Sequence, residues 1–130
     1  MDEILNNKKN LYLKKAYECL DDAEFNYISN RLSVCINRSY YCILHCMNAC
    51  IVINGFEFSK HSAVISKFRE LFMKYQLLPV ELSEFINDLF EYRNIYDYNI
   101  EAIPDDITAK DCLHAARRFY DEVKKYFEVK

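Results

Sequence analysis

Residues 36–50 read INRSYYCILHCMNAC, and this stretch decides the fold that we expect. It belongs to a segment of about residues 31–53 in which apolar side chains occur nearly all round a helical wheel. Such a helix is either central in its bundle or shares its surface with a partner chain. In a bundle as small as this one, the interpretation with a partner is favoured.

The flanking segments are apolar on one helical face only. We expect one helix from about residue 3 or 10 to Ser29 or Asn30, and another after a cap at Ser59. A fourth should open at Pro79 and end near Asn99, and residues 104–106 should cap a fifth. The side chains expected to face the core are Leu13, Ala16, Leu20, Ala23 and Tyr27; Val64, Phe68, Leu71, Phe72 and Tyr75; Leu82, Ile86 and Leu89; and Ala109, Cys112, Ala116, Phe119, Val123 and Phe127.

The composition favours helices over sheets. Only one Gly and two Pro occur in 130 residues, whereas a sheet protein needs more turn residues than that. Hydrophobic residues make up 52% of the chain, which excludes a disordered tail. We therefore predict an all-α, up-and-down bundle of four to five helices that forms a single domain over residues 1–130.

The charge balance excludes a protein that coats nucleic acid by bulk attraction. There are 17 basic and 20 acidic residues, for a net charge of −3. A local phosphate-binding site is still allowed. No apolar run approaches the roughly 18 residues of a membrane span, and the N-terminus is polar, so we expect no membrane contact and a cytoplasmic location.

Four of the six cysteines lie on the expected central helix, at positions 35, 42, 46 and 50. Their side chains run parallel along one stripe and cannot easily pair with each other. His45 beside Cys46 leaves a metal site open as an alternative, but tight C-x2-C pairs, the usual zinc pattern, do not occur. We favour reduced core cysteines and expect neither metal nor cofactor.

The stretch EYRNIYDYNI, residues 91–100, places Arg93 where the helical pattern asks for an apolar residue. Ile86 and Leu89 precede it on the same face. An unpaired buried charge costs several kcal/mol, so Arg93 must be paired or must line a wet groove. Asp97 lies one turn further on, and one interpretation is a structural Arg93–Asp97 pair that ties off the helix.

A second inward-facing arginine favours a groove instead. Arg38 lies in phase with His45 on the central helix, and both helices carry tyrosines that can reach the same place. Arginine binds phosphate bidentately and tyrosine stacks on bases, so a nucleotide or an RNA backbone would fit such a groove. The tyrosines concerned are Tyr40, Tyr41, Tyr96 and Tyr98.

At these residues the chain resembles the HEPN superfamily (higher eukaryotes and prokaryotes nucleotide-binding), especially its small stand-alone prokaryotic branch. The resemblance covers about residues 13–127, and its most specific elements are YYxxxH, ending at His45, and R-x3-DY, beginning at Arg93. The matching stretches are KKAYECLDDAEFNYISNRLSVCINRSYYCILHCMNACI, SKHSAVISKFRELFMKY, LFEYRNIYDYNI and DCLHAARRFYDEVKKYF.

The resemblance implies a helical bundle that forms a homodimer, with the arginine motif of each protomer facing a shared cleft. Many HEPN proteins are metal-independent ribonucleases, often the toxin of a toxin–antitoxin pair. The resemblance also implies a minimal nucleotidyltransferase as antitoxin partner, in some cases one that adenylylates a tyrosine near the motif. Tyr96 and Tyr98 are the candidates for that modification.

The nuclease signature of the family is incomplete in this chain. Its arginine and the polar residue that follows match Arg93 and Asn94, but the positions open to its histidine hold Tyr98, Asn99 and Ile100. RNA cleavage needs a group that exchanges a proton near pH 7, and a phenol with a pKa of about 10 is a poor substitute for imidazole.

The three histidines of the chain do not have the spacing of the signature. His61 is interpreted first as a surface residue at the start of a helix, His45 as a core histidine among aromatics, and His114 as a solvated side chain. Each remains open as a substitute for the absent histidine.

The sequence thus predicts a component of a toxin–antitoxin-like system that binds nucleotide or RNA through a cleft centred on Arg93. One alternative is a metal-independent ribonuclease in which Arg93 and Tyr98 are catalytic candidates and another group transfers the proton. A second alternative is an oligomeric helical bundle without a ligand. The residues expected to bind are Arg38, Tyr41, His61, Arg93, Asn94, Asp97 and Tyr98.

Overall fold

A computed structural model describes residues 2–128 of the chain. Its elements are all helical, which confirms the predicted all-α class. η1 is a turn of π-helix that continues α3 directly. In order along the chain the elements are α1 (Glu3–Ile28), α2 (Leu32–Val52), α3 (His61–Phe68), η1 (Arg69–Met73), α4 (Glu81–Tyr98) and α5 (Asp106–Glu128).

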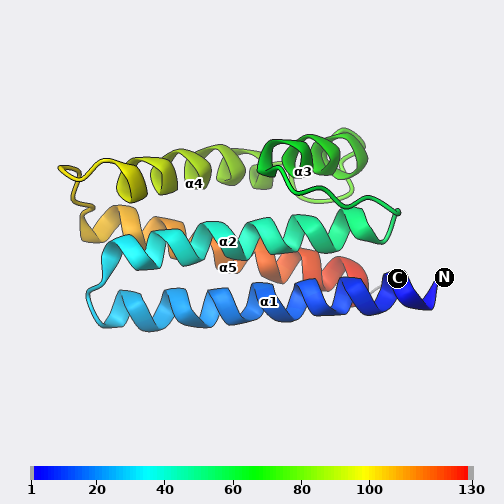
Figure 1. Ribbon diagram of the computed structural model, residues 1–130, viewed down its shortest axis with the longest axis horizontal. Coiled ribbons are helices and arrows are strands. Elements are labelled where there is room, and N and C mark those ends of the chain that lie inside the picture. Colours follow the sequence, from blue (N-terminus) through cyan, green and yellow to red (C-terminus); the bar gives the residue numbers. More distant parts are fainter. Residues whose placement is uncertain (1, 129–130) are drawn as a thin grey trace.

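The long helices α1, α2, α4 and α5 lie side by side and alternate in direction, with α3 continuing the layer of α4 (Figure 1). α2 packs against α1, α3, α4 and α5. The preferred interpretation of its apolar surface, a partner chain, is therefore not needed, because helices of the same chain cover it. None of the described helices is both long enough and apolar enough to cross a membrane.

The helix ends follow the local signals in the sequence. Asn30 adopts a positive φ of 59°, a conformation that stops α1 where Ser29 or Asn30 was expected to stop it. The Asp105 carboxylate accepts a hydrogen bond from the backbone N–H of Thr108 at 2.7 Å and caps α5. The carbonyl of Pro79 accepts from the N–H of Leu82 at 3.2 Å, just before α4.

Two expectations about the third helix are wrong. Ser59 does not cap it; the N-cap position is Lys60, which makes no side-chain cap, and α3 begins at His61. Tyr75 does not face the core, because its side chain is 65% exposed. The wider π turn ends at Met73 and so changes the phase of the face before the chain turns at Gln76, whose φ is 54°.

The core is built around aromatic side chains and the cysteines of α2. Phe68 stacks on Phe72 with ring centroids 5.6 Å apart and packs against Phe119 of α5 at 5.7 Å. The expected interpretation of the cysteines as core residues agrees with their positions. All six are free and buried: Cys19, Cys35, Cys42, Cys46, Cys50 and Cys112.

Alanine substitutions at Phe119 and at Tyr75 should have different effects on the free energy of unfolding, because Phe119 is buried and Tyr75 is exposed. Phe119→Ala removes a fully buried ring and should lower the free energy of unfolding by about 3–5 kcal/mol. Tyr75→Ala should change it by less than about 0.5 kcal/mol, because the ring is mostly exposed. Urea denaturation followed by circular dichroism measures both, and equal losses would contradict the placement of Tyr75.

Candidate functional site

Arg93 lies on the inner face of α4, in phase with the buried residues Ile86 and Leu89. Its side chain is only 7% exposed. One terminal nitrogen, Nη1, donates to the hydroxyl oxygen of Tyr98 at 3.3 Å. Its Nε is buried and has no hydrogen-bond partner among residues 2–128. The guanidinium is therefore buried with part of its hydrogen-bonding capacity unused.

Aromatic rings surround this guanidinium. Its Cζ lies 4.6 Å from the ring centroid of Tyr40 and 5.7 Å from that of Tyr41, both on α2. On α4, the rings of Tyr98 and Phe90 lie 5.8 and 6.0 Å away. Each such contact is worth about 0.5–1 kcal/mol when exposed and about 2 kcal/mol when desolvated, so the π faces offset part of the cost of burial.

The simple interpretation of Arg93 as the partner of Asp97 is wrong. Asp97 is exposed and accepts a hydrogen bond from the side-chain amide of Asn37 on α2 at 2.8 Å. Across the described chain, residues 2–128, no carboxylate forms an ion pair with Arg93. The Asp97 carboxylate is instead held across the interface between α4 and α2.

Arg38 also contacts the Tyr41 ring. Its Cζ is 5.1 Å from the Tyr41 ring centroid, and its Nε and Nη2 donate to the side-chain oxygen of Asn37 at 2.9 and 2.7 Å. Its Nη1 lies 3.8 Å from the sulfur of Cys19. Both guanidinium groups thus lie within about 6 Å of one half-buried tyrosine ring.

His61, the first residue of α3, contacts the same tyrosines. Its Nδ1 lies 3.0 Å from the Tyr40 hydroxyl, and its ring centroid is 5.7 Å from that of Tyr41. Burial and then the charge of Arg93 hold the pKa of His61 below its ordinary value. Burial raises the pKa of Tyr40, and Arg93 offsets part of that rise. Both groups are therefore neutral at pH 7.

The seven side chains from α2, α3 and α4 that are named at the end of this paragraph form the Arg93 cluster. Its buried part is Tyr40 and Arg93, and its most exposed part is Tyr98, which is 75% exposed. The members are Arg38, Tyr40, Tyr41, His61, Phe90, Arg93 and Tyr98.

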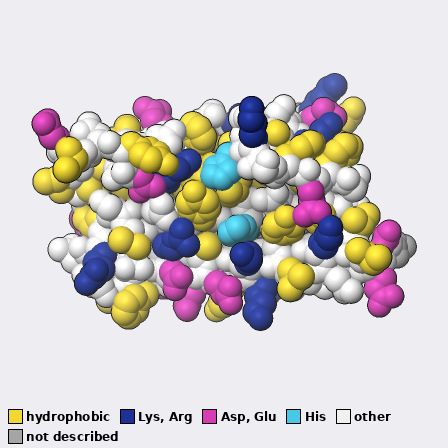
Figure 2. Space-filling view, in the orientation of Figure 1, with side chains coloured by type: hydrophobic (Ala, Val, Ile, Leu, Met, Phe, Trp, Pro, Cys, Tyr) yellow, Lys and Arg dark blue, Asp and Glu magenta, His cyan; other side chains and the backbone are white. Residues whose placement is uncertain are grey.

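His45 flanks Tyr41 from the side of α1. Its ring centroid is 6.4 Å from Tyr41 and 6.5 Å from Tyr12. Burial, followed by the charges of Lys15 and Arg38, lowers the pKa of His45 to about 4. Figure 2 shows histidine side chains in the middle of this face, among hydrophobic and basic side chains. The imidazole of His45 is therefore neutral under ordinary conditions.

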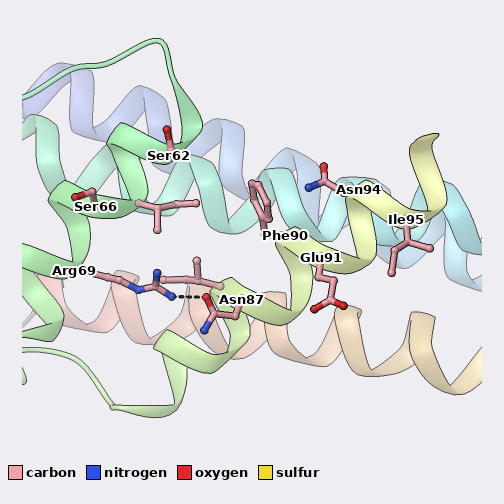
Figure 3. A pocket seen from close by; sticks show the side chains of 10 residues that line it. Ser62, Ser66, Arg69, Asn87, Phe90, Glu91, Asn94 and Ile95 are labelled. Carbon is pink, nitrogen blue, oxygen red and sulfur yellow. Dashed lines mark hydrogen bonds between the residues drawn. The ribbon is translucent and has the colours of Figure 1, made fainter. Parts of the chain in front are cut away.

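A groove of about 870 Å³ runs between α3 and α4, beside the Arg93 cluster. Phe90 lies at the boundary, because it lines the groove and also contacts Arg93. Figure 3 shows Asn94 at the same groove, with Arg69 and Asn87 joined by a hydrogen bond of 2.9 Å. Asn94 thus reaches the groove rather than the guanidinium.

Two sequence candidates lie away from the cluster. Tyr96 is half-buried and stacks on Tyr92, with centroids 6.4 Å apart. His114 is an exposed residue of α5. In the part of the chain that the structure describes, no three His, Cys, Asp or Glu side chains are grouped to hold a metal ion. The polar side chains of the cluster carry guanidinium, imidazole and phenol groups.

The lowered pKa of His45 predicts a loss of stability in acid. The unfolded state takes up a proton as the pH falls below about 6.5, whereas the folded imidazole stays neutral down to about pH 4. Between pH 7 and pH 5 this difference should cost about 2 kcal/mol, at 1.36 kcal/mol per pH unit. Urea denaturation at the two pH values measures the loss for the wild type.

His45→Gln is the matched variant, since it has no titrating group at this position. Its stability should fall less over the same pH range, and the difference from the wild type isolates His45 from the carboxylates. An equal fall in both proteins would show that the imidazole titrates normally in the folded state.

Comparisons with known proteins identify the family. The HEPN domain matches residues 10–126. A Thermotoga maritima protein named UPF0332 protein is 35% identical over 115 residues, which cover 88% of this chain and 87% of the relative. A Methanocaldococcus jannaschii protein named "putative toxin" is 32% identical over 114 residues, covering 88% of this chain and 78% of the relative. The chain belongs to the HEPN domain family.

Proposed function

We propose that this HEPN protein is the toxin-like component of a two-protein system and that it binds the phosphate of a nucleotide or RNA at the Arg93 cluster. The proposal is supported by the family and by the printed name of the M. jannaschii relative. The observation that carries it is the Arg93 guanidinium, which is only 7% exposed and forms no ion pair with a carboxylate within residues 2–128.

A phosphate group matches Arg93 in charge and in hydrogen bonding. Guanidinium groups bind phosphate oxygens through paired N–H donors, and the pair is stronger away from bulk water. Arg38 adds a second positive charge, 5.1 Å from the Tyr41 ring centroid. Access is through Tyr98, which is exposed and holds Arg93 by a single hydrogen bond of 3.3 Å.

The rim of the cluster offers contacts for the rest of a nucleotide. Tyr98, which is 75% exposed, presents ring surface on which a base can stack. Asp97, exposed beside Asn37, can accept a hydrogen bond from a ribose hydroxyl. Asn94 lines the neighbouring groove and presents an amide that donates and accepts. The binding residues expected from the sequence therefore fall into two sets. Those at the centre of the cluster would bind the phosphate, and those at its rim would bind the base and the ribose.

The proposed assembly is a homodimer in which the second copy covers the end of α4. Apolar side chains are exposed there and just beyond it: Ile95 is 37% exposed, Ile100 98% and Ile103 86%. These side chains lie close along the chain to Tyr98, so a copy packed on them would also narrow the access to Arg93.

The proposed partner is a minimal nucleotidyltransferase, and Tyr98 is the favoured acceptor of an AMP group. Tyr98 is 75% exposed, whereas Tyr96 is half-buried against Tyr92. In the transfer, the tyrosine hydroxyl loses its proton to the solvent, its oxygen bonds to the α-phosphorus of ATP, and the bond from that phosphorus to pyrophosphate breaks. The new phosphate would lie close to Arg93, because the hydroxyl is 3.3 Å from Nη1, and would occupy the site.

A second candidate function is metal-independent cleavage of RNA. It is favoured by the position of His61, which contacts both Tyr40 and the surroundings of Arg93.

Replacement of Arg93 tests the binding proposal. Arg93→Ala should weaken the binding of a fluorescein-labelled single-stranded RNA, and of ATP as a competitor, by about 5- to 150-fold. This is the effect of losing a charge-assisted contact of about 1–3 kcal/mol. Fluorescence anisotropy at fixed salt measures the affinity, and thermal unfolding shows that the variant is folded.

The matched control is Arg117→Ala. Arg117 is an exposed arginine of α5 that pairs with Glu24 at 2.6 Å, so its loss removes the same charge from another place. Its affinity should equal that of the wild type. Equal affinities for both variants would reject the phosphate site and leave a helical bundle without a ligand.

Modification by a nucleotidyltransferase should depend on Tyr98. After co-expression with a minimal nucleotidyltransferase, the intact mass of the wild type and of Tyr96→Phe should increase by one adenylate. Tyr98→Phe should stay unmodified, because the exposed hydroxyl is gone. Adenylate on Tyr98→Phe, located by peptide mass spectrometry, would place the acceptor elsewhere.

A further inference from the structure

Three helices bring a histidine, a tyrosine and an arginine together. His61 begins α3, Tyr40 is buried in α2, and Arg93 is buried in α4. The Nδ1 of His61 is 3.0 Å from the Tyr40 hydroxyl, and the guanidinium carbon of Arg93 is 4.6 Å from the Tyr40 ring. The charge of Arg93 also acts on the imidazole directly. An imidazole is thus held next to the proposed phosphate site.

The hydrogen bond to Tyr40 determines which nitrogen of His61 is available. Nδ1 is engaged with the hydroxyl, so Nε2 is the nitrogen that can face a substrate. When Nδ1 carries the hydrogen and donates it to the Tyr40 oxygen, Nε2 has a free lone pair. A histidine oriented in this way by a second residue is the usual arrangement of a general base.

We propose that His61 is the catalytic base of RNA cleavage at the Arg93 cluster, and that Tyr40 is its positioning residue. The substrate class is single-stranded RNA with a free 2′-hydroxyl next to the bound phosphodiester. This inference rests on the proposed binding of RNA phosphate by Arg93. The base then comes from α3 rather than from the end of α4, where Tyr98, Asn99 and Ile100 follow the arginine.

The reaction is an internal transfer at phosphorus. His61 Nε2 takes the proton of the 2′-hydroxyl, a bond forms between the 2′-oxygen and phosphorus, and the bond from phosphorus to the 5′-oxygen breaks. The leaving 5′-oxygen takes a proton from water, and His61 returns its proton to the solvent. The guanidinium of Arg93 stabilises the negative charge on the phosphoryl oxygens. The products are a 2′,3′-cyclic phosphate and a 5′-hydroxyl.

The other histidines are less suited to this role. His45 lies on the side of Tyr41 that faces Tyr12, and its Nδ1 is buried without a hydrogen bond within residues 2–128. His114 is on the surface of α5. Of the three, only His61 is held by a buried residue that also contacts Arg93.

The surroundings of His61 determine the expected pH profile. The titratable and charged groups that face it are Tyr40, Tyr41 and His45 on α2 and Arg93 on α4. Because the pKa of His61 is lowered by burial and by Arg93, the neutral base is the main form at pH 7. The cleavage rate should therefore be level near neutral pH and fall in acid, as Nε2 becomes protonated.

The direct test is cleavage of labelled single-stranded RNA in EDTA. His61→Ala should lower the cleavage rate by about 10²- to 10⁴-fold, the usual contribution of a general base. Its RNA affinity, measured with a non-cleavable 2′-O-methyl strand, should stay within about twofold of the wild type. His114→Ala is the matched control and should cleave at the wild-type rate. Mass spectrometry should find cyclic phosphate ends.

The outcomes separate the two proposals. If the wild type binds RNA in an Arg93-dependent manner but does not cleave it, the role of His61 is rejected and the binding function stands. A full cleavage rate in His61→Ala, or in His61→Gln as a second variant, also rejects it. If Arg93→Ala binds RNA as tightly as the wild type, the proposed function itself fails.

The positioning role of Tyr40 has its own test. Tyr40→Phe keeps the ring beside Arg93 and removes only the hydroxyl that holds His61. The expected result is a lower kcat with an unchanged KM and a displaced acid limb of the pH profile. An unchanged pH profile would show that the hydroxyl does not act on the imidazole.

Discussion

A buried guanidinium held by aromatic faces is the constraint on which the arrangement of α2, α3 and α4 depends. Arg93 is 7% exposed and contacts the rings of Tyr40 and Tyr41 across the helix interface. Removing a cation from water costs several kcal/mol, and the π faces return only part of that cost. The tyrosines must therefore stay in place, and because the Tyr40 hydroxyl meets His61, the start of α3 is held with them.

The sequence predicts the helices well where local rules decide them. Periodic apolar residues define the buried faces, and Asn30 and Asp105 stop and start helices by their own side-chain and backbone chemistry. The same reasoning fails at Tyr75. The π turn at Arg69–Met73 rotates the following residues out of phase with the buried face of α3, and no residue pattern in the sequence marks this turn. Local rules also do not predict what covers the apolar surface of α2, because this depends on how the other helices pack against it.

The site shows a similar division between local and long-range information. The helical phase of Arg38 and Arg93 predicts that both lie on inner faces, and in the structure both guanidinium groups contact the Tyr41 ring. The expected pairing of Arg93 with Asp97 is wrong. Their spacing along one helix shows only that the two side chains could meet, and the Asp97 carboxylate instead accepts a hydrogen bond from Asn37 of α2. The contact between His61 and Tyr40 joins two helices, and no local pattern could have predicted it.

The charges of the cluster give a physical reason why binding and chemistry would be linked. Two guanidinium groups contact Tyr41, and burial followed by nearby positive charges lowers the pKa of both neighbouring imidazoles. A phosphodiester on the Tyr98 side of Arg93 would bring a negative charge next to this guanidinium. The same negative charge favours imidazolium, so His61 would hold a proton more firmly once the substrate is bound. An imidazole that is neutral before binding and a stronger base after it would act on the RNA bound beside it rather than on the solvent.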